Sequence, residues 1–350
     1  MKINRDITHK EARPMNVEKS LFDQVASFEN LHLAFQECSR GKRGKSGYQK
    51  YLFPYGERLK TCEQELKRTK TYRWCGYREF YVHDPKKRLV MAAPFKDRIV
   101  HTAIHRIIEP LIDPLLGSRS FACRIGRGNR AAVLRLINQL QNMGPKRYCI
   151  KLDVKKYFQS ISHKILFDKI MSPLPDDSLK TLLYDLIRSH EKYNDLNRGI
   201  PIGNLTSQIF ANFYLSELDQ AACHLLDLNY LNDDYEVDNA YIRYMDDLVI
   251  LTRDKKKAFH VANELISIAH KKLELNIPEE KKVPLSSDPI PFLGFVLSHD
   301  TQRTLRRNER KFKKKVKRLK RRQAPLSYLA QVNLSYESWS DIAQLNNKKG

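Results

Sequence analysis

The sequence of 350 residues has only six cysteines, and no two of them are spaced as a CxxC pair. The common cysteine pattern of zinc modules is therefore missing, and reduced thiols fit better than a disulfide framework. No run of 18 apolar residues occurs, and the first twenty residues lack the apolar stretch of a secretory leader. We therefore expect a cytoplasmic protein with no membrane partner.

Acidic residues are scarce relative to basic ones: 40 Asp and Glu face 63 Lys and Arg, a formal net charge of +23. This balance indicates a polyanionic partner, of which nucleic acid is the simplest. Residues 301–322 hold 13 basic residues and one acidic residue, with apolar residues at helical spacing. The segment could be a solvated face, but so much like charge favours an amphipathic helix that contacts nucleic acid.

Two adjacent carboxylates stand in Tyr244-Met245-Asp246-Asp247, between apolar runs typical of strands. Neighbouring strand residues point to opposite faces, so both acids can converge only if a turn lies between the strands. Like charges so close raise each other's pKa unless a cation separates them, and Mg²⁺ is the usual cation. A plain polar turn is the alternative interpretation.

A third carboxylate, Asp153, ends the apolar segment 148–154, which reads as a buried strand. A charge at such a position is costly unless it is functional, although a helix N-cap is the plainer alternative. Together with the acids of the YMDD turn, Asp153 could hold two Mg²⁺ ions about 4 Å apart, as in polymerases, with Mn²⁺ as a substitute.

The rest of the chain predicts an α+β order of elements. A hairpin with a basic tip is expected over 77–93, and the basic loop 39–45 is either a solvated connection or a phosphate contact. Hydrophobic spacing predicts helices over 52–68, 95–116, 131–141, 163–190, 209–226 and 258–273.

His101 and His105 lie four residues apart and so share one helix face, as a zinc pair would. No third Cys or His lies nearby, so we favour packed or surface imidazoles over a metal site.

Four segments come in the order and spacing of a reverse transcriptase palm: Leu152 to Phe158, Gly203 to Gln208, Tyr244 to Asp247 and Phe292 to Phe295. Phe95 to Val100 resembles the fingers helix of the bacterial, group II intron-like members, and the resemblance covers roughly residues 28–345. It implies an RNA-directed DNA polymerase with a right-hand fold. The implied division is an N-terminal helical extension (1–70), fingers (71–147), palm (148–298) and a basic helical thumb (299–350).

One segment indicates which subfamily of reverse transcriptases the chain resembles. Most bacterial relatives carry Gln-Gly…Ser-Pro before the YxDD turn, whereas this chain has Ile202 for the Gln and Gln208 for the Pro. The variant, with Gly199 to Pro201 before it, Phe210 to Asn212 after it and Ser338 to Ser340 near the end, resembles the enzymes of diversity-generating retroelements.

That subfamily implies a bacterial or phage-encoded polymerase that copies a template-repeat RNA into cDNA, with frequent errors opposite adenine. It also implies a small basic oligomeric accessory protein as partner and, because the chain ends soon after residue 345, no nuclease domain. The alternatives are a retron-type or other group II-like enzyme of ordinary fidelity and an RNA-binding, maturase-like module.

The resemblance assigns roles to residues. Asp153, Asp246 and Asp247, with the backbone of Val154, would hold the metals, and Lys281 or Lys282 would be the general acid. Phe158 would exclude a ribose 2′-hydroxyl, although it could be plain core, and it would contact the dNTP with Lys86, Arg88 and Gln208. Template and primer contacts fall on Ile202, Gly203, Tyr244, Met245, Phe292, Leu293 and Gly294. The thumb residues against the nucleic-acid backbone are Arg306, Arg307, Arg310, Lys314, Lys317 and Arg321.

Overall fold

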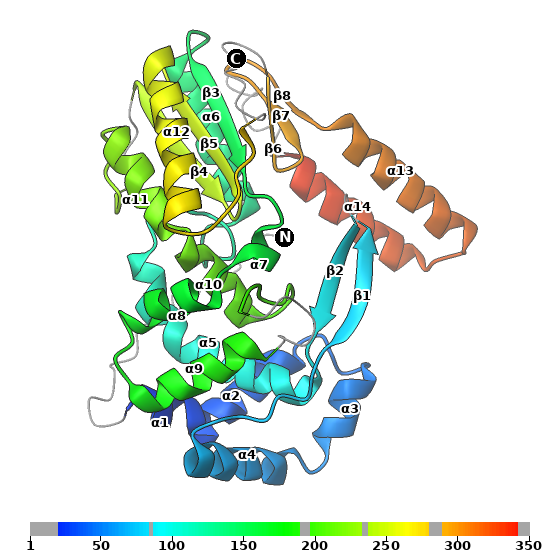
Figure 1. Cartoon of the computed structure of the whole chain (residues 1–350). Coiled ribbons are helices and arrows are strands. Elements are labelled where there is room, and N and C mark those ends of the chain that lie inside the picture. The colour runs from blue at the N-terminus through cyan, green and yellow to red at the C-terminus, as the bar shows by residue number, and fades with distance from the viewer. Residues whose placement is uncertain (1–19, 84–86, 190–196, 233–236, 280–288, 342–350) are drawn as a thin grey trace.

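A three-stranded antiparallel sheet forms the centre of the palm (Figure 1). In the computed structural model, which describes residues 20–83, 87–189, 197–232, 237–279 and 289–341, the strand order is β3-β5-β4. The strands are β3 (Tyr148–Asp153), β5 (Asp247–Thr252) and β4 (Asn239–Tyr244). The strand and hairpin predicted around Asp153 and the YMDD turn are therefore confirmed, and they belong to one sheet.

Helices cover both faces of this sheet (Figure 1). One face packs on α12 (Lys255–Lys271) and α11 (Ser216–Leu225), the other on α6 (Asn129–Met143). Successive strand residues alternate between the two cores, with Ile150 and Leu152 in the first and Cys149 in the second. The same alternation places Asp153 and Asp247 on the face that carries α6.

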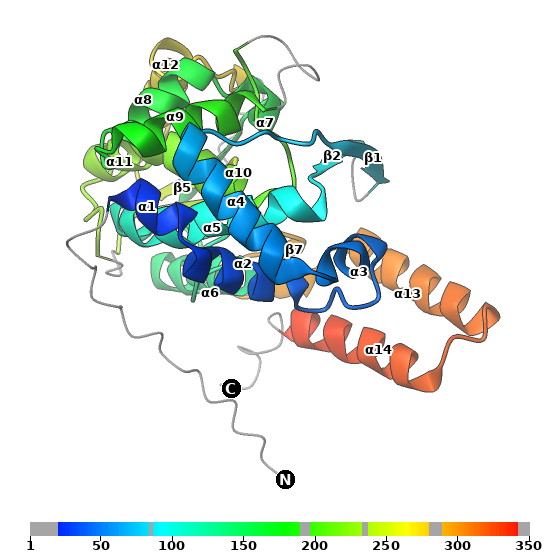
Figure 2. The same cartoon turned by 90° about the horizontal axis from the view of Figure 1, so that it is seen from below.

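The fingers are built around α5 (Phe95–Ile112), whose buried face holds most of its apolar residues. Helices from the start of the chain surround it (Figures 1 and 2). Those that pack against α5 are α1 (Leu21–Ala26), α2 (Phe28–Ser39) and α3 (Ser46–Leu52), whereas α4 (Tyr55–Thr69) packs on α1 and α2. The predicted hairpin is confirmed as β1 (Arg78–His83) and β2 (Lys87–Ala92), and every residue of β1 is exposed. The hairpin thus projects from the fingers.

The C-terminal part combines a small sheet with two helices. Strands β6 (Ile290–Phe292), β7 (Phe295–Leu297) and β8 (Gln302–Thr304) form an antiparallel sheet. The predicted basic helix is confirmed as α13 (Arg306–Arg321), and it pairs with α14 (Leu326–Ser340). Both views show this pair extending away from the palm (Figures 1 and 2).

Two predicted helices were wrong in their length. The segment 163–190 is divided into α8 (His163–Met171) and α9 (Asp177–Arg188), because Pro173 and Pro175 lack the backbone N–H that a continuous helix needs. Asp176 caps the second helix by accepting from Leu179 N at 2.9 Å. The segment 209–226 is likewise α10 (Leu205–Tyr214) followed by α11, with the break at Leu215. Apolar spacing continues across both breaks and so hides them. The short helix α7 (Tyr157–Ser160) completes the palm.

The interpretation of His101 as a packed imidazole is confirmed by its burial on α5. His101 is buried, and its Nδ1 lies 2.8 Å from Thr206 Oγ1. All six cysteines are free thiols, as predicted. Within the ranges that the structure describes, no helix has the length and apolar character needed to cross a bilayer.

His101 makes the stability of the fold depend on pH. Burial lowers the pKa of its imidazole to about 3, below the value of about 6.5 for an unfolded chain. The unfolded chain then binds the extra proton, so this contribution to stability is full above pH 6.5 and is lost as the pH falls below it. We expect wild-type protein to lose about 2 kcal/mol more than His101→Gln between pH 7 and pH 5, measured by urea unfolding. Equal losses in both proteins would contradict this.

Candidate active site

Three carboxylates lie at one end of the palm sheet. The strand register pairs Asp153 directly with Asp247, and opposite residues of antiparallel strands lie on the same face. Asp246 belongs to the two-residue turn that joins β4 to β5, and its backbone oxygen lies 3.4 Å from Val154 N. The first residue of that turn, Met245, has φ 56, which a tight hairpin loop requires but which is uncommon for a side chain of this size.

The electrostatics of this cluster favour a cation. Burial raises the pKa of the Asp246 carboxyl, and the negative charges of Asp153 and Asp247 raise it further. Arg88, from the β1–β2 hairpin of the fingers, opposes the rise. All three acids are half-buried rather than enclosed, so a ligand from solvent can reach them. A carboxylate group of this kind is what divalent metals bind, because the cation removes the repulsion.

A lysine already neutralises part of this charge. Lys151 Nζ lies 3.1 Å from Asp247 Oδ1 and 2.8 Å from the carbonyl oxygen of Pro291 on β6. In the described part of the chain, the three aspartates are not gathered closely enough to count as a metal site as they stand. The donor set nevertheless fits a divalent metal, because these are hard oxygen ligands that share one end of the sheet.

A buried guanidinium supports the turn from the opposite face of the sheet. Arg243 is fully buried and forms a bidentate ion pair with Asp219 of α11, at 2.7 and 2.6 Å. It also donates to Asn212 Oδ1 at 3.1 Å, to Ser120 Oγ at 2.9 Å and to the carbonyl oxygen of Met245 at 3.1 Å. One side chain thus joins the palm helices, the segment before α6 and the YMDD turn.

Comparison with known families decides the assignment. Residues 83–297 match the model of the family described as reverse transcriptase (RNA-dependent DNA polymerase), which is more than half of the chain. The chain belongs to the reverse transcriptase family. The α+β right-hand fold predicted from the sequence is accordingly confirmed.

The curated relatives of this reverse transcriptase include group II intron-encoded protein LtrA of Lactococcus lactis, 23% identical over 312 residues. That match covers 72% of this chain and 51% of LtrA. Protein YkfC of Escherichia coli K12 is 25% identical over 232 residues, covering 57% of this chain and 60% of its own length. The chain therefore spans about half to three fifths of these relatives.

Solved structures similar to the reverse transcriptase include an apo telomerase from Candida tropicalis, truncated from its C-terminal domain. Its TM-score is 0.48 at 16% identity, over 65% of this chain and 55% of that one.

Of the residues predicted to contact dNTP and template, Phe158 lies on α7, Ile202 and Gly203 lie in the segment before α10, and Gln208 lies on α10. Phe158 is half-buried at the start of α7, and its backbone oxygen accepts from Ile200 N at 2.8 Å. Ile200 belongs to the loop before α10. Two residues further along, the same loop bonds to the fingers hairpin, because Ile202 O accepts from Met91 N at 3.2 Å. Gly203 has φ 126, and Gln208 is half-buried on α10. Fingers hairpin, loop and palm are therefore linked through the backbone.

The segment predicted to contact the primer, Phe292 to Gly294, has one residue in the core and two in a turn. The Phe292 side chain is 1% exposed and packs in the core next to α6, so it is not available to a primer. Leu293 and Gly294, with φ 45 and 97, form the turn between β6 and β7. Tyr244 and Met245 are half-buried beside the acids. Contact with a primer from the β6–β7 hairpin would therefore involve its turn.

The thumb of the reverse transcriptase presents its basic residues to solvent. Phe312 stacks on Tyr336 of α14 with ring centroids 3.8 Å apart, so the apolar face of α13 is turned toward its partner helix. The six predicted backbone contacts are all exposed on α13: Arg306, Arg307, Arg310, Lys314, Lys317 and Arg321. The thumb is attached at Gly294, whose carbonyl oxygen accepts from Leu305 N at 2.9 Å and from Asn308 Nδ2 at 3.1 Å.

Only glycine fits at position 294. A Cβ there would lie 2.8 Å from both Asn308 Nδ2 and Trp339 Cζ2, at a positive φ. We expect Gly294→Ala to destabilise the chain by about 1–3 kcal/mol and to raise the primer KM, because the thumb must shift. Gly126→Ala is the matched control, since Gly126 also has a positive φ but no atom within 4 Å of a Cβ. Thermal unfolding and primer extension measure both effects, and equal losses in the two variants would show that contact with the thumb is irrelevant.

Three residues with predicted roles lie outside the described residues: Lys86, predicted to contact dNTP, and Lys281 and Lys282, predicted as the general acid.

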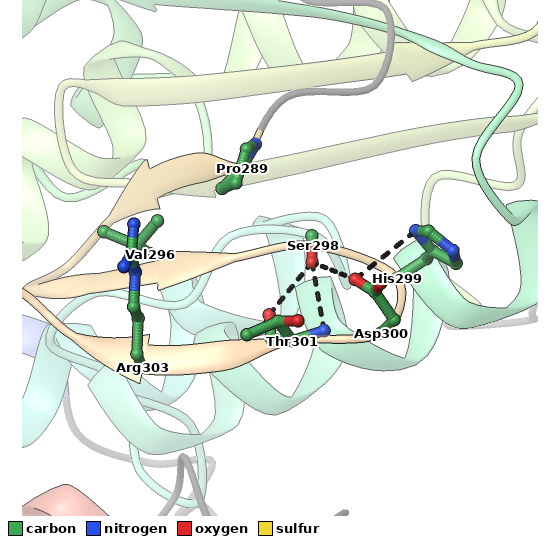
Figure 3. A pocket seen from close by; sticks show the side chains of 7 residues that line it. All are labelled: Pro289, Val296, Ser298, His299, Asp300, Thr301 and Arg303. Carbon is green, nitrogen blue, oxygen red and sulfur yellow. Dashed lines mark hydrogen bonds and ion pairs between the residues drawn. The ribbon is translucent and has the colours of Figure 1, made fainter.

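A hollow of about 290 Å³ lies beside the β7–β8 hairpin (Figure 3), and none of Asp153, Asp246 and Asp247 lines it. Its polar groups bond to one another, with Ser298 Oγ 2.6 Å from Asp300 Oδ1 and 3.0 Å from Thr301 N. It is a feature of the hairpin rather than part of the active site.

Sequence reasoning missed three residues of this site: Lys151, Arg243 and Asp219. A weak signal existed for two of them, since Lys151 and Arg243 are charged residues inside otherwise apolar strands. Asp219 lies in the first turn of α11, where an acid is common, and nothing in the sequence pairs it with Arg243.

Proposed function

We propose that this member of the reverse transcriptase family is an RNA-directed DNA polymerase that extends a primer on an RNA template by two-metal nucleotidyl transfer. The observation that carries the proposal is the register that sets Asp153 opposite Asp247, beside an Asp246 whose pKa is raised by burial and by both neighbours. The net charge of +23 and the exposed basic face of α13 suit a nucleic-acid duplex.

The residues of the chain have separate tasks in this proposal. Asp153, Asp246 and Asp247 hold the metals, with the backbone of Val154 beside them. Bound Mg²⁺, or Mn²⁺ in its place, would lower the pKa of the primer 3′-hydroxyl and neutralise the triphosphate. Arg88 supplies a charged donor to the triphosphate from the fingers hairpin. The half-buried ring of Phe158 restricts the space beside the sugar and so favours dNTPs.

Primer extension tests this proposal directly. Purified protein with an RNA template, a DNA primer, dNTPs and Mg²⁺ should yield cDNA, and EDTA should stop the reaction. Substituting NTPs should reduce incorporation strongly, because a 2′-hydroxyl would meet Phe158. Absence of cDNA on every RNA template tried, under conditions where the protein binds the template, would instead favour an RNA-binding, maturase-like role. A relative with that printed role is nuclear intron maturase 4 of Arabidopsis thaliana, 25% identical over 141 residues, which are 39% of this chain and 17% of that protein.

We propose further that the enzyme is of the diversity-generating type, copying a template-repeat RNA with errors at adenines. The support is the variant segment from Ile202 to Gln208, which is joined to β2 through Met91 N and so lies between the fingers hairpin and α10. A small basic oligomeric accessory protein would be its partner. Adding that protein should stimulate cDNA synthesis, whereas indifference to it would favour an enzyme that works alone.

Sequencing the cDNA made from an adenine-rich RNA template decides the subtype. We expect substitutions at template adenines at least about tenfold more often than at the other three bases, a difference of the size that one lost pocket contact produces. Ile202→Gln, which restores the residue of most relatives, should reduce that excess. Equal error rates at all four bases would assign an enzyme of ordinary fidelity, of the retron or group II type.

A further inference from the structure

Lys151 occupies an unusual position for a strand lysine. It lies two residues before Asp153 on β3, so both side chains share the face of the sheet that also carries Asp247. Its ammonium is 3.1 Å from Asp247 Oδ1 and 3.4 Å from Oδ2, and the side chains of both residues are 27% exposed. The lysine therefore contacts one of the three proposed metal ligands through both carboxylate oxygens.

The same ammonium reaches a second sheet. It donates to the carbonyl oxygen of Pro291 at 2.8 Å and lies 5.8 Å from the centre of the Phe292 ring. Both residues belong to β6, whose turn with β7 anchors the thumb through Gly294. Lys151 thus connects Asp247 of the YMDD motif to β6, the first strand of the hairpin before the thumb.

We propose that Lys151 is a positioning residue that acts as the internal counter-ion of Asp247 and is displaced from it by the divalent metal. A cation on Asp247 and an ammonium within 3.1 Å of the same oxygen repel each other, so both cannot stay in place. Lys151 keeps its bond to Pro291 after it releases Asp247, so metal binding is coupled to β6. The inference rests on the proposed function, because it assumes that Asp247 is a metal ligand.

This arrangement has a physical advantage for an enzyme that must wait for its substrates. Three carboxylates at one end of a sheet repel one another, as the raised pKa of Asp246 reflects in part. A lysine from within the sheet reduces the charge without closing the site, since it remains partly exposed. Metal affinity in the free protein is then kept low.

A titration with Mn²⁺ alone, followed by the electron paramagnetic resonance signal of the free ion, tests the proposal without any turnover. We expect Lys151→Met to bind Mn²⁺ about three- to tenfold more tightly than wild type, because one partly exposed ion pair no longer competes. Lys151→Arg keeps the charge and should retain wild-type affinity. Lys256→Met is the matched control, since Lys256 is an exposed lysine at the start of α12 and its loss changes net charge equally.

The outcomes separate the inference from the proposed function. Equal or weaker Mn²⁺ binding by Lys151→Met, relative to Lys256→Met, overturns the counter-ion role, provided thermal unfolding in EDTA shows both proteins folded. Should Lys151→Met fail to fold, Lys151→Gln takes its place, with the same expected direction. If Asp246→Asn binds Mn²⁺ as well as wild type does, the acids are not the metal site, and the proposed function fails with the inference.

Discussion

Asp246→Asn should lower the rate of nucleotide incorporation by about a thousandfold or more, while leaving the metal-free protein at least as stable as wild type. An amide cannot replace the charge of a metal-bound carboxylate, and a bound metal stabilises the transition state by several kcal/mol. Stability should not fall, because burial and the neighbouring acids already disfavour the charged form of Asp246. Single-turnover primer extension measures the first effect, and thermal unfolding in EDTA measures the second.

Thermal unfolding with added Mg²⁺ separates wild type from Asp246→Asn more clearly than unfolding in EDTA does. A ligand that binds only the folded state raises its apparent stability, so Mg²⁺ should raise the unfolding midpoint of wild type more than that of Asp246→Asn. Glu264→Gln, an exposed carboxylate on α12, is the control and should behave as wild type in both measurements. Incorporation by Asp246→Asn within tenfold of wild type would show that the chemistry lies elsewhere.

The sequence predicted that the three acids of the candidate site lie at one end of a sheet, because the signals for them are local. An apolar strand that ends in Asp153 and two strand-like runs around the YMDD turn each show in a few consecutive residues. Bringing the three acids together needed only the assumption that the strand ending at Asp153 and the YMDD hairpin belong to one sheet. The register of Asp153 with Asp247 could not be read from the chain, since shifting a strand by one residue would turn each side chain to the other face.

The features that sequence reasoning missed depend on contacts between distant segments. Phe292 was predicted to contact primer, yet it is core, because the face of a three-residue strand is set by what packs on it. Arg243 meets Asp219 and Ser120, which lie 24 and 123 residues away in the chain. No periodicity in a short window encodes such a partner. The missed helix breaks have the same origin, since apolar spacing reports burial and not continuity.

Arg243→Met should destabilise the protein by about 3–5 kcal/mol, because it leaves Asp219 buried without its counter-charge. Both side chains are essentially fully buried, at 0% and 1% exposure, so water cannot replace the lost partner. Arg243→Lys should recover part of that stability but not the bidentate geometry, nor the bond to the Met245 carbonyl oxygen. Its incorporation rate should therefore fall more than its stability would suggest, because the YMDD turn loses a support.

The double variant Arg243→Met with Asp219→Asn tests whether the pair acts as a unit. Neither charge is then buried without its partner. The double variant should therefore lose about 2 kcal/mol less unfolding free energy than the sum of the losses in the two single variants. Tyr241, whose hydroxyl donates to Asp219 Oδ1 at 2.8 Å, still has an acceptor in the amide of the variant. Urea unfolding of the four proteins gives the coupling energy. Additive costs would mean that Arg243 stabilises the fold through Asn212, Ser120 and Met245, and that the ion pair itself contributes little.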